Sequence, residues 1–354
     1  MFRRIHMAVF SFAALVVSIA SLTHFNAALA QQPAPIKIGM LGALSDVPLL
    51  IAEREGYFKA EGLKIETIPF KSGAQLVAPL GTGQIDVAAG VVAAGLNNLS
   101  VRGVDLKIVS DRGSMSPGHG YMSFLVRKDL VDSGKYKTYA DLKGMKVGSQ
   151  SKGGAAESTL NELLKLGGLK FSDVDITYLG HAELAVALGS KAIDASFVTE
   201  PYATLAVNQG SAVRIVTGDK IYPNQVLGML AYGGSFIKDR PDVAVKFMKA
   251  FLRGCRLYNA AYDSNGKFIP GPTAEKVKAA YKSIMDLKDD RLLDEIVPSG
   301  CDVDGKLNIA GMKKDYEFFK QRGLIQGEVN IELLIDMTFA ERAASELAKT
   351  AQTR

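Results

Sequence analysis

One short segment occurs twice in this chain, and the repeat constrains the fold more than any other feature. Residues 74–88 read AQLVAPLGTGQIDVA and residues 182–196 read AELAVALGSKAIDAS, an offset of 108 positions. Each copy is typical of a helix, a glycine that ends the helix, a tight turn and a strand that opens on Ile-Asp. Chance similarity between small α/β units is the alternative. Because the offset is far too long for a solenoid, we interpret the repeat as two lobes built on one plan.

Strand patterns alternate with helical patterns on both sides of these copies. Residues 36–41 and 63–70 read as strands, and residues 48–58 between them read as a helix. This order recurs to about residue 217, which predicts an α/β architecture with largely parallel sheets. The C-terminal third is predicted to be mainly helical, with helices over 241–262, 273–285 and 309–321. Residues 345–354 are expected to fray.

Two glycine-rich segments are the best places for the chain to cross between lobes. The first is residues 113–120, GSMSPGHG, and the second is residues 218–234, which contain four glycines and a proline between Gly218 and Gly234. They predict one lobe from residues 36–120 together with 223–354, and a second lobe from residues 121–222.

The N-terminal thirty residues read as an export signal. Arg3 and Arg4 precede an apolar run over residues 7–20, and Ala28-Leu29-Ala30 is typical of a cleavage site. The alternative is a membrane anchor, but the run is shorter than the ~20 apolar residues that a span needs. We therefore expect cleavage after Ala30, a short tether over residues 31–35, and a periplasmic product.

The chain contains two cysteines, Cys255 and Cys301. A lipoprotein needs a cysteine at its cleavage site, so a lipid anchor is not expected. Cys255 follows Phe247 and Phe251 at helical spacing, which places it on a buried helix face, whereas Cys301 lies in a turn-rich segment. We favour two unpaired thiols, with a disulfide as the alternative in an oxidising compartment.

Charge and motifs argue against several classes of function. The net charge of +5 falls to +3 when Arg3 and Arg4 leave with the signal, which is too mild to indicate nucleic-acid binding. No H-E-x-x-H, paired C-x-x-C or G-x-S-x-G motif is present, and residues 148–154 lack the G-K-[ST] ending of a phosphate loop. After cleavage the chain keeps only His119, read as a surface residue near a crossing, and His181. We expect no catalytic residue, metal or cofactor.

Polar and glycine-rich loops follow the predicted strands, and ligands of open α/β sheets bind at that edge. The candidate ligand-binding residues are Ser45, Asp46, Ser72, Gly90, Val91, Ser151, Lys152, Gly153, Gly154, Thr199 and Glu200. Ser151 to Gly154 open a helix, whose free N–H groups favour an anion. The alternatives are structural: an ordinary helix start there, helix capping by Ser45 and Asp46, and a solvated first-turn carboxylate at Glu200.

Four segments resemble the nitrate/sulfonate/taurine-type substrate-binding proteins and the related binders of thiamine-pyrimidine precursors. They are PLLIAEREGYFKAEGLKIE, LGTGQIDVAAG, YADLKGMKVGSQSKGGAAE and LGSKAIDASFVTEPY, within a resemblance over residues 36–265. The resemblance implies the two-lobe fold of type II periplasmic binding proteins, with two crossovers between lobes. It also implies closure around a small molecule and delivery to the permease of an ABC importer in the inner membrane.

The identity of the ligand stays open between sulfonate-, carboxylate- and pyrimidine-like molecules. We expect an organic ligand with an anionic end near Ser151 and N–H or O–H groups near Glu200, because Asp46 and Glu200 would repel a purely inorganic anion. A monomer is expected. The alternatives from other classes are a pyrimidine-synthase-like enzyme of the same fold, whose cysteine-rich iron motif this chain lacks, and a ligand-sensing module.

Overall fold

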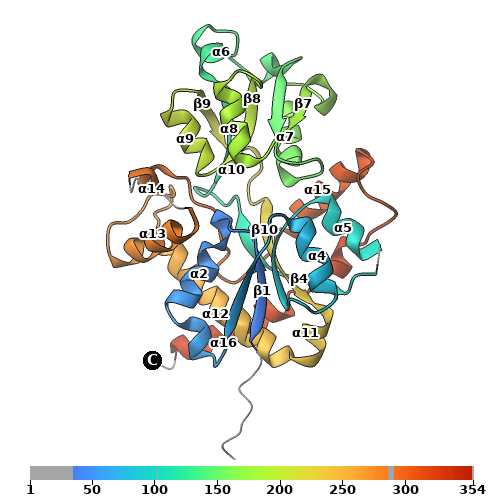
Figure 1. Cartoon of the computed structure of the whole chain (residues 1–354), viewed down its shortest axis with the longest axis vertical. Helices are drawn as coiled ribbons and strands as arrows, with labels where there is room; N and C mark the ends of the chain where they lie inside the picture. The colour runs from blue at the N-terminus through green and yellow to red at the C-terminus, as the bar shows by residue number, and fades with distance from the viewer. Residues whose placement is uncertain (1–34, 102, 286–290, 353–354) are drawn as a thin grey trace, which may run out of the picture. The chain divides into compact units, whose positions relative to one another are not determined.

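The computed structural model describes residues 35–101, 103–285 and 291–352 (Figure 1). The predicted signal peptide, its cleavage site and nearly all of the tether lie outside the described residues. Among those residues, none of the helices combines the length and the apolar character that a membrane span requires.

The strands of the described chain form two five-stranded sheets. The first has the order β2-β1-β3-β10-β4 and the second has the order β7-β6-β8-β5-β9. The strands of the first sheet are β1 (Ile36–Met40), β2 (Ile65–Pro69), β3 (Val87–Val91), β4 (Leu106–Ser114) and β10 (Val226–Gly233). Those of the second are β5 (Met122–Arg127), β6 (Lys146–Ser149), β7 (Asp175–Tyr178), β8 (Ala195–Thr199) and β9 (Ala212–Thr217).

One antiparallel strand in each sheet marks a crossing of the chain. The chain leaves the first sheet after β4 and enters the second at β5, which runs antiparallel to β8 and β9. It returns after β9 and enters the first sheet at β10, which runs antiparallel to β3 and β4. The predicted α/β class with two sheets and two crossings is confirmed. The residue boundaries of the two lobes stay a prediction.

Both copies of the repeat fold in the same way. The first forms α4 (Gly73–Gly81) and β3, and the second forms α8 (His181–Gly189) and β8, so every boundary differs by the same 108 positions. Each copy turns through a residue with left-handed backbone, Gly83 with φ 73° and Lys191 with φ 65°.

Helices pack on both faces of each sheet (Figure 1). On the first sheet, Phe247 and Phe251 belong to one core cluster with Ile38, and Leu76 of α4 belongs to another with Met229. The remaining α-helices of the described residues are α2 (Val47–Arg54), α3 (Tyr57–Ala60), α5 (Ala94–Val101), α6 (Lys128–Asp132), α7 (Ala155–Leu166), α9 (Tyr202–Asn208), α10 (Gly218–Ile221), α11 (Gly234–Asp239), α12 (Pro241–Asn259), α13 (Pro272–Met285), α14 (Arg291–Glu295), α15 (Ile309–Gln321) and α16 (Thr338–Gln352).

The C-terminal third confirms the three predicted helices as α12, α13 and α15 and adds α14 and α16. The predicted fraying over 345–354 is wrong for the described part of that range, because α16 continues to Gln352. Ala343 is buried in the core that α12 shares, and Leu347 packs against it. This contact holds the last helix in place.

Cys255 and Cys301 form a disulfide, with their Cα atoms 5.5 Å apart, so the favoured prediction of two unpaired thiols is wrong. Cys255 does lie on the buried face of α12. Gly300, the residue before Cys301, donates its N–H to the carbonyl of Ser114 on β4 (2.8 Å). The side chain of Asn259 on α12 donates to the carbonyl of Cys301 (2.6 Å). These contacts bring a turn that looks unconstrained in sequence against the end of α12.

Candidate functional site

In the first sheet, a buried arginine gathers three of the predicted site residues. Arg112 on β4 forms an ion pair with Asp46 and donates to the hydroxyl of Ser45 (2.8 Å) and the carbonyl of Gly90 (2.8 Å). The side chains of both Arg112 and Asp46 are fully buried. The carboxyl ends of β1, β3 and β4 are therefore held together by one guanidinium.

Glycines make room for this arginine. A Cβ atom at Gly228 on β10 would lie 3.1 Å from Nη2 of Arg112, and one at Gly113 would lie 2.6 Å from the Cβ of Ser45. Burial raises the pKa of Asp46, while Arg112 and the N–H of Ala43 act in the opposite direction. The pair is a compensated buried charge, and such pairs fix geometry more reliably than they add stability.

Arg112 was not predicted from the sequence, although a signal was present. The pair Asp111-Arg112 follows the apolar residues Ile108 and Val109 in one strand pattern. Charged residues are almost never fully buried unless they are paired, so a charged pair inside a strand pattern indicates a buried network. The Nε of Arg112 is buried without a hydrogen-bond partner in the protein.

In the second sheet, the helix start at Ser151–Gly154 already holds a carboxylate from its own chain. Glu157 accepts the N–H of Gly153 (2.7 Å) and the hydroxyl of Tyr178 (2.6 Å), and it pairs with Arg322 (2.6 Å). The buried Glu157 thus supplies the negative charge that a helix N-terminus favours. An anionic ligand would have to use the rest of this loop.

The same loop contacts the residues that follow β3. Gly153 accepts the N–H of Ala94 at its carbonyl (2.9 Å), and Gly154 forms an isolated antiparallel bridge with Ala93. Gly153 has φ 74°, and a Cβ there would lie 3.0 Å from the Cβ of Ala94, so glycine suits this close approach. Ser151 and Lys152 are exposed, and within the described chain Lys152 pairs with no carboxylate.

The carboxylate of Glu200 is buried and has protein partners. It accepts from Arg214 (2.7 Å) and from the N–H of Thr204 (2.9 Å), and burial raises its pKa while Arg214 lowers it. Thr199, the preceding residue, shares a hydrogen bond of 2.8 Å with Nδ1 of His181, and burial lowers the pKa of His181 to about 4. The imidazole is therefore neutral at physiological pH.

The remaining predicted residues, Ser72 and Val91, lie where β2 and β3 end in the first sheet. Ser72 is exposed, Val91 is 38% exposed, and a Cβ at Gly73 would lie 2.9 Å from Cγ2 of Val91. The structure thus brings Gly73, the residue after Ser72, against Val91. It joins Ser45, Asp46 and Gly90 through Arg112, and it joins the residues after Val91 to Gly153 and Gly154. It gives Glu200 a separate network.

Two further serines were missed. The hydroxyls of Ser149, which ends β6, and Ser123, near the start of β5, are buried without a hydrogen-bond partner in the protein. Because β5 runs antiparallel to β8, Ser123 and Thr199 lie at the same sheet edge. Buried polar groups of this kind are rare and call for a partner. No set of three metal-ligating side chains occurs among the described residues.

Comparisons with known proteins identify the family and its fold. The model of the NMT1-like family matches residues 29–266. A protein of Bacillus subtilis (strain 168) named "Putative aliphatic sulfonates-binding protein" is 26% identical over 322 residues, covering 88% of each chain. The resemblance found in the sequence is confirmed.

Solved structures share the fold at low identity. The alkanesulfonate-binding protein SsuA from Xanthomonas axonopodis pv. citri, bound to MOPS, has a TM-score of 0.67 and 20% identity, with coverage of 87% of this chain and 99% of that one. The desulfurization enzyme DSZB has a TM-score of 0.60 and 13% identity, with coverage of 88% and 99%. Binding proteins and an enzyme therefore share this fold, which alone does not decide between the two.

Proposed function

We propose that this chain, which belongs to the NMT1-like family, is the extracytoplasmic solute-binding protein of an ABC importer. It captures a small organic anion at the facing edges of its two sheets and delivers it to a permease in the inner membrane. The observation that carries the proposal is the direct contact of Ala93 and Ala94 with Gly153 and Gly154, which brings the carboxyl-end loops of both sheets to one place.

The charge and polarity of these loops favour an anionic ligand. Lys152 is exposed beside the hydroxyl-bearing Ser151, and no carboxylate of the described chain neutralises it. Ser149, Ser123 and the Nε of Arg112 add buried donors without protein partners. Because an unmade hydrogen bond of a buried group costs about 1–3 kcal/mol, a ligand that accepts from these donors gains from their burial. A sulfonate or carboxylate offers two or three acceptor oxygens.

The buried carboxylates near this edge act as positioning residues in the proposed site. Asp46 holds Arg112, Glu157 holds the loop N–H of Gly153, and Glu200 holds Arg214. In this arrangement the N–H or O–H groups expected of the ligand near Glu200 become unnecessary, since Glu200 already accepts from protein donors. The ligand is then selected mainly by its anionic end.

Closure of the lobes has candidate contacts in α15. Asp315 accepts from Ser158 of α7 (2.5 Å), Lys314 pairs with Glu162 of the same helix (2.5 Å), and the hydroxyl of Tyr222 donates to the carbonyl of Gly311 (2.9 Å). A hinged domain closure that forms such contacts on ligand binding is a common binding mechanism. We propose the same for this chain.

Export completes the proposal. Cleavage after Ala30 would release a mature chain that starts at Gln31 and acts as a monomer in the periplasm. Intact-mass measurement of the secreted protein tests the cleavage, and a different first residue or an acyl mass would contradict it. Sedimentation of the same sample tests the monomer.

Binding is tested by thermal unfolding and calorimetry with ethanesulfonate, nitrate and the uncharged dimethyl sulfone. We expect ethanesulfonate alone to stabilise the protein, by ~2.7 kcal/mol at about 100 times its Kd. Lys152→Ala should weaken its binding about three- to tenfold, the worth of one exposed charged contact. Lys143→Ala is the control, because Lys143 is equally exposed but lies on another loop.

Two results would overturn the proposal. The first is the absence of binding for sulfonates and carboxylates alike. The second is a small-angle scattering profile that stays unchanged at saturation with a bound ligand, since closure must reduce the radius of gyration.

A further inference from the structure

The second half of the repeat carries a polar pair where the first half carries an apolar contact. A shift of 108 positions matches Gly73 to His181 and Val91 to Thr199. A Cβ at Gly73 would lie 2.9 Å from Cγ2 of Val91, so the start of α4 touches the end of β3. At the matching place, Nδ1 of His181 shares a hydrogen bond of 2.8 Å with Oγ1 of Thr199. The contact is thus common to both halves, but only the second half brings an imidazole to it.

This imidazole reaches across the carboxyl end of β6. His181 comes after β7 and Thr199 ends β8, and β6 lies between those two strands and parallel to both. Ser149, which ends β6, accepts the N–H of Leu179 at its carbonyl (3.0 Å), and this bond brings the start of α8 close to that strand end. The loop that carries Lys152, the proposed anion contact, begins at the same strand end. His181 therefore lies at the ligand edge of the second sheet.

Thr199 determines which imidazole nitrogen carries the proton. Among the described residues its hydroxyl makes no other hydrogen bond, so its proton finds an acceptor only at Nδ1 of His181. A neutral imidazole that accepts at Nδ1 carries its own proton at Nε2. Nε2 of His181 has no hydrogen-bond partner within the described chain and, unlike Nε2 of His119, it is not enclosed by protein atoms. The ring thus offers one N–H that a solute can reach.

The imidazole is a neutral donor, and no carboxylate competes for it. Burial lowers the pKa of His181 to about 4, and no charged side chain acts against this shift. The acidic side chains of the adjoining elements have other partners. They are Glu183 of α8 with the N–H of Gly180 (2.8 Å), Glu157 of α7 with Arg322, and Glu200 after β8 with Arg214. An oxygen of an anionic solute can therefore accept from Nε2 without displacing an acceptor of the protein.

We propose that His181 contacts the solute and that its Nε2–H donates to an oxygen of the anion. This inference rests on the proposed solute-binding function and adds to it a contact residue that the sequence analysis did not single out. Thr199 is a positioning residue in this arrangement, since it acts on the solute only through the imidazole. A neutral N–H supplies direction rather than charge, so it fixes where an oxygen of the anion lies relative to Lys152.

Nitrogen NMR of the imidazoles in the secreted protein tests the tautomer and the contact. His181→Gln assigns the signals, because it removes those of one ring. Without ligand and at about pH 7, we expect His181 to be neutral with its proton on Nε2. Saturating ethanesulfonate should shift the Nε2 resonance and raise the pKa of His181, since a nearby negative charge favours the imidazolium. Propionate replaces ethanesulfonate if only carboxylates bind.

Calorimetry with the same probe separates the donor from its support. His181→Ala should weaken binding about tenfold or more, because a hydrogen bond to a charged group is lost. His181→Gln should recover most of the affinity, since its side-chain amide can place an N–H near the position of Nε2. Thr199→Val should weaken binding less than His181→Ala, and its NMR spectrum should show both neutral tautomers.

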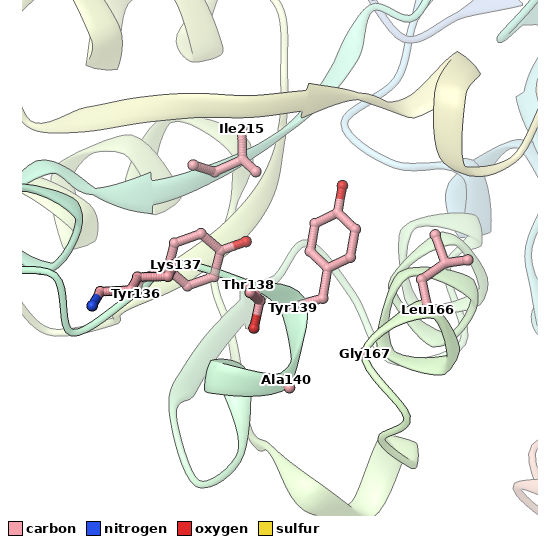
Figure 2. A pocket seen from close by; sticks show the side chains of 8 residues that line it. All are labelled: Tyr136, Lys137, Thr138, Tyr139, Ala140, Leu166, Gly167 and Ile215. Atoms are coloured by element: carbon pink, nitrogen blue, oxygen red, sulfur yellow. The ribbon is translucent and has the colours of Figure 1, made fainter.

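Tyr139→Phe is the matched control, because it removes a hydroxyl at the far end of α7. Figure 2 shows that tyrosine with Ile215 and Leu166 on opposite sides of its ring. Since α7 has 12 residues, this place lies about 18 Å from the Ser151–Gly154 loop. Its affinity for the probe should equal that of the wild type.

The outcomes distinguish this inference from the function on which it rests. If the wild-type protein binds neither sulfonates nor carboxylates, the proposed function fails and this inference fails with it. If a probe binds but His181→Ala binds it equally well, or the Nε2 resonance does not respond, only this inference fails. A proton on Nδ1 in the protein without ligand would also overturn it, because Nε2 would then have nothing to donate.

Discussion

The two copies of the Ile-Asp turn are alike in their backbone contacts and differ in the arginine that completes them. In the first sheet, Asp86 accepts the N–H of Lys37 (2.9 Å), and in the second, Asp194 accepts the N–H of Lys146 (2.9 Å). In both copies, a carboxylate after the helix-turn thus fixes the start of the neighbouring strand.

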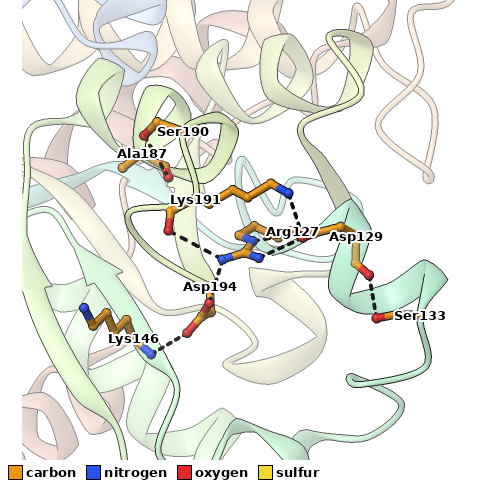
Figure 3. A network of polar contacts seen from close by, with 8 residues as sticks. All are labelled: Arg127, Asp129, Ser133, Lys146, Ala187, Ser190, Lys191 and Asp194. Atoms are coloured by element: carbon orange, nitrogen blue, oxygen red, sulfur yellow. Dashed lines mark hydrogen bonds and ion pairs between the residues drawn. The ribbon is translucent and has the colours of Figure 1, made fainter.

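The arginine partners come from different parts of the chain. Arg127, at the end of β5, pairs with Asp194 (2.9 Å) and with Asp129 (2.8 Å), as Figure 3 shows. Arg240, which precedes α12, pairs with Asp86. β5 and β10 hold equivalent places in the two sheets, yet Arg127 is the last residue of β5, whereas Arg240 comes only after α11. The two copies therefore share the hydrogen bond from the strand N–H to the aspartate, whereas the arginine that pairs with that aspartate comes from a different place in each half.

A second pair of networks shows how burial changes the meaning of an ion pair. Arg112 on β4 pairs with Asp46, and Arg214 on β9, the equivalent strand, pairs with Glu200. The first pair is fully buried on both sides, whereas the side chain of Arg214 is 23% exposed. Water can therefore replace part of the contacts of Arg214, but it cannot reach Arg112.

The largest expected effect comes from removing the buried arginine. Arg112→Met should lower the free energy of unfolding by about 3–5 kcal/mol, because it leaves the Asp46 carboxylate buried and unpaired. Arg214→Met should cost less, about 1–3 kcal/mol, since Glu200 keeps the N–H of Thr204. Urea unfolding of both variants measures the difference. Equal losses would mean that exposure does not distinguish the two networks.

Measuring ligand affinity and stability together shows whether the network of Glu200 and Arg214 holds the protein or the ligand. Glu200→Gln should lower stability, because it weakens the bond from Arg214, while ethanesulfonate affinity changes less than threefold, below the worth of one direct hydrogen bond. Calorimetry and thermal unfolding of this single variant separate the two readouts. A loss of affinity without a loss of stability would show that Glu200 contacts the ligand directly, as the sequence suggested.

The contact between α15 and α7 should respond to pH. Burial raises the pKa of Asp315 to about 6, although Ser158, Gln225, Tyr222 and Lys314 act to lower it. The native state then binds more protons than the unfolded state, whose Asp pKa is near 3.8, so the stability supplied by this group should fall as pH rises from about 4 to about 6. Asp315→Asn should flatten this part of the melting-temperature profile. An unchanged slope in the variant would assign the pH dependence to other acids such as Asp111, whose pKa burial raises to about 7.

The two turns themselves can be compared by alanine substitution. Asp86→Ala and Asp194→Ala should each destabilise the protein by about 1–2 kcal/mol, because both leave a strand N–H without its acceptor. Similar values would support the view that the shared backbone bond dominates. If Asp194→Ala costs clearly more, the Arg127 network is the main contributor, and Arg127→Met should reproduce the excess.

The smallest effect is expected at the left-handed position of the turn. Lys191→Gly should raise the free energy of unfolding by about 0.5–1 kcal/mol, since glycine adopts positive φ without the cost that an L side chain meets. Gly83→Lys should lower it by a similar amount or more, because a Cβ there would approach the Ser235 hydroxyl at 3.1 Å. Chemical denaturation of both variants resolves the difference. A loss of stability in Lys191→Gly would show that the ion pair of Lys191 with Asp129 (3.3 Å) outweighs the backbone cost.

Local patterns in the sequence predicted most of the fold and only part of the site. The repeat, the glycine-rich crossings and the helical spacing of α12 follow rules that act over a few residues, so they can be read directly. Arg112 meets Asp46 across 66 residues, and Cys301 meets Cys255 across 46. Such partners are set by sheet order and chain return, which no local pattern encodes.

The helix start at Ser151–Gly154 shows the same limit in another form. The glycines and the small polar residues predicted a loop that something approaches closely, and Ala94 does approach it. The sequence did not reveal that Glu157, one turn into the helix, fills the N-terminal position with its own charge. A carboxylate three or four residues after a glycine-rich helix start was the available signal.

The first sheet takes its last strand, β10, from the part of the chain that follows the whole second sheet, and this order has a consequence for biosynthesis. Every strand of the second sheet lies between Met122 and Thr217, so that sheet can be complete once residue 217 has emerged from the ribosome or the translocation channel. The first sheet waits longer, because β10, which ends at Gly233, must insert between β3 and β4. The half of the protein whose synthesis begins first is therefore finished last, and until then β3 and β4 present unpaired edges that are open to mispairing.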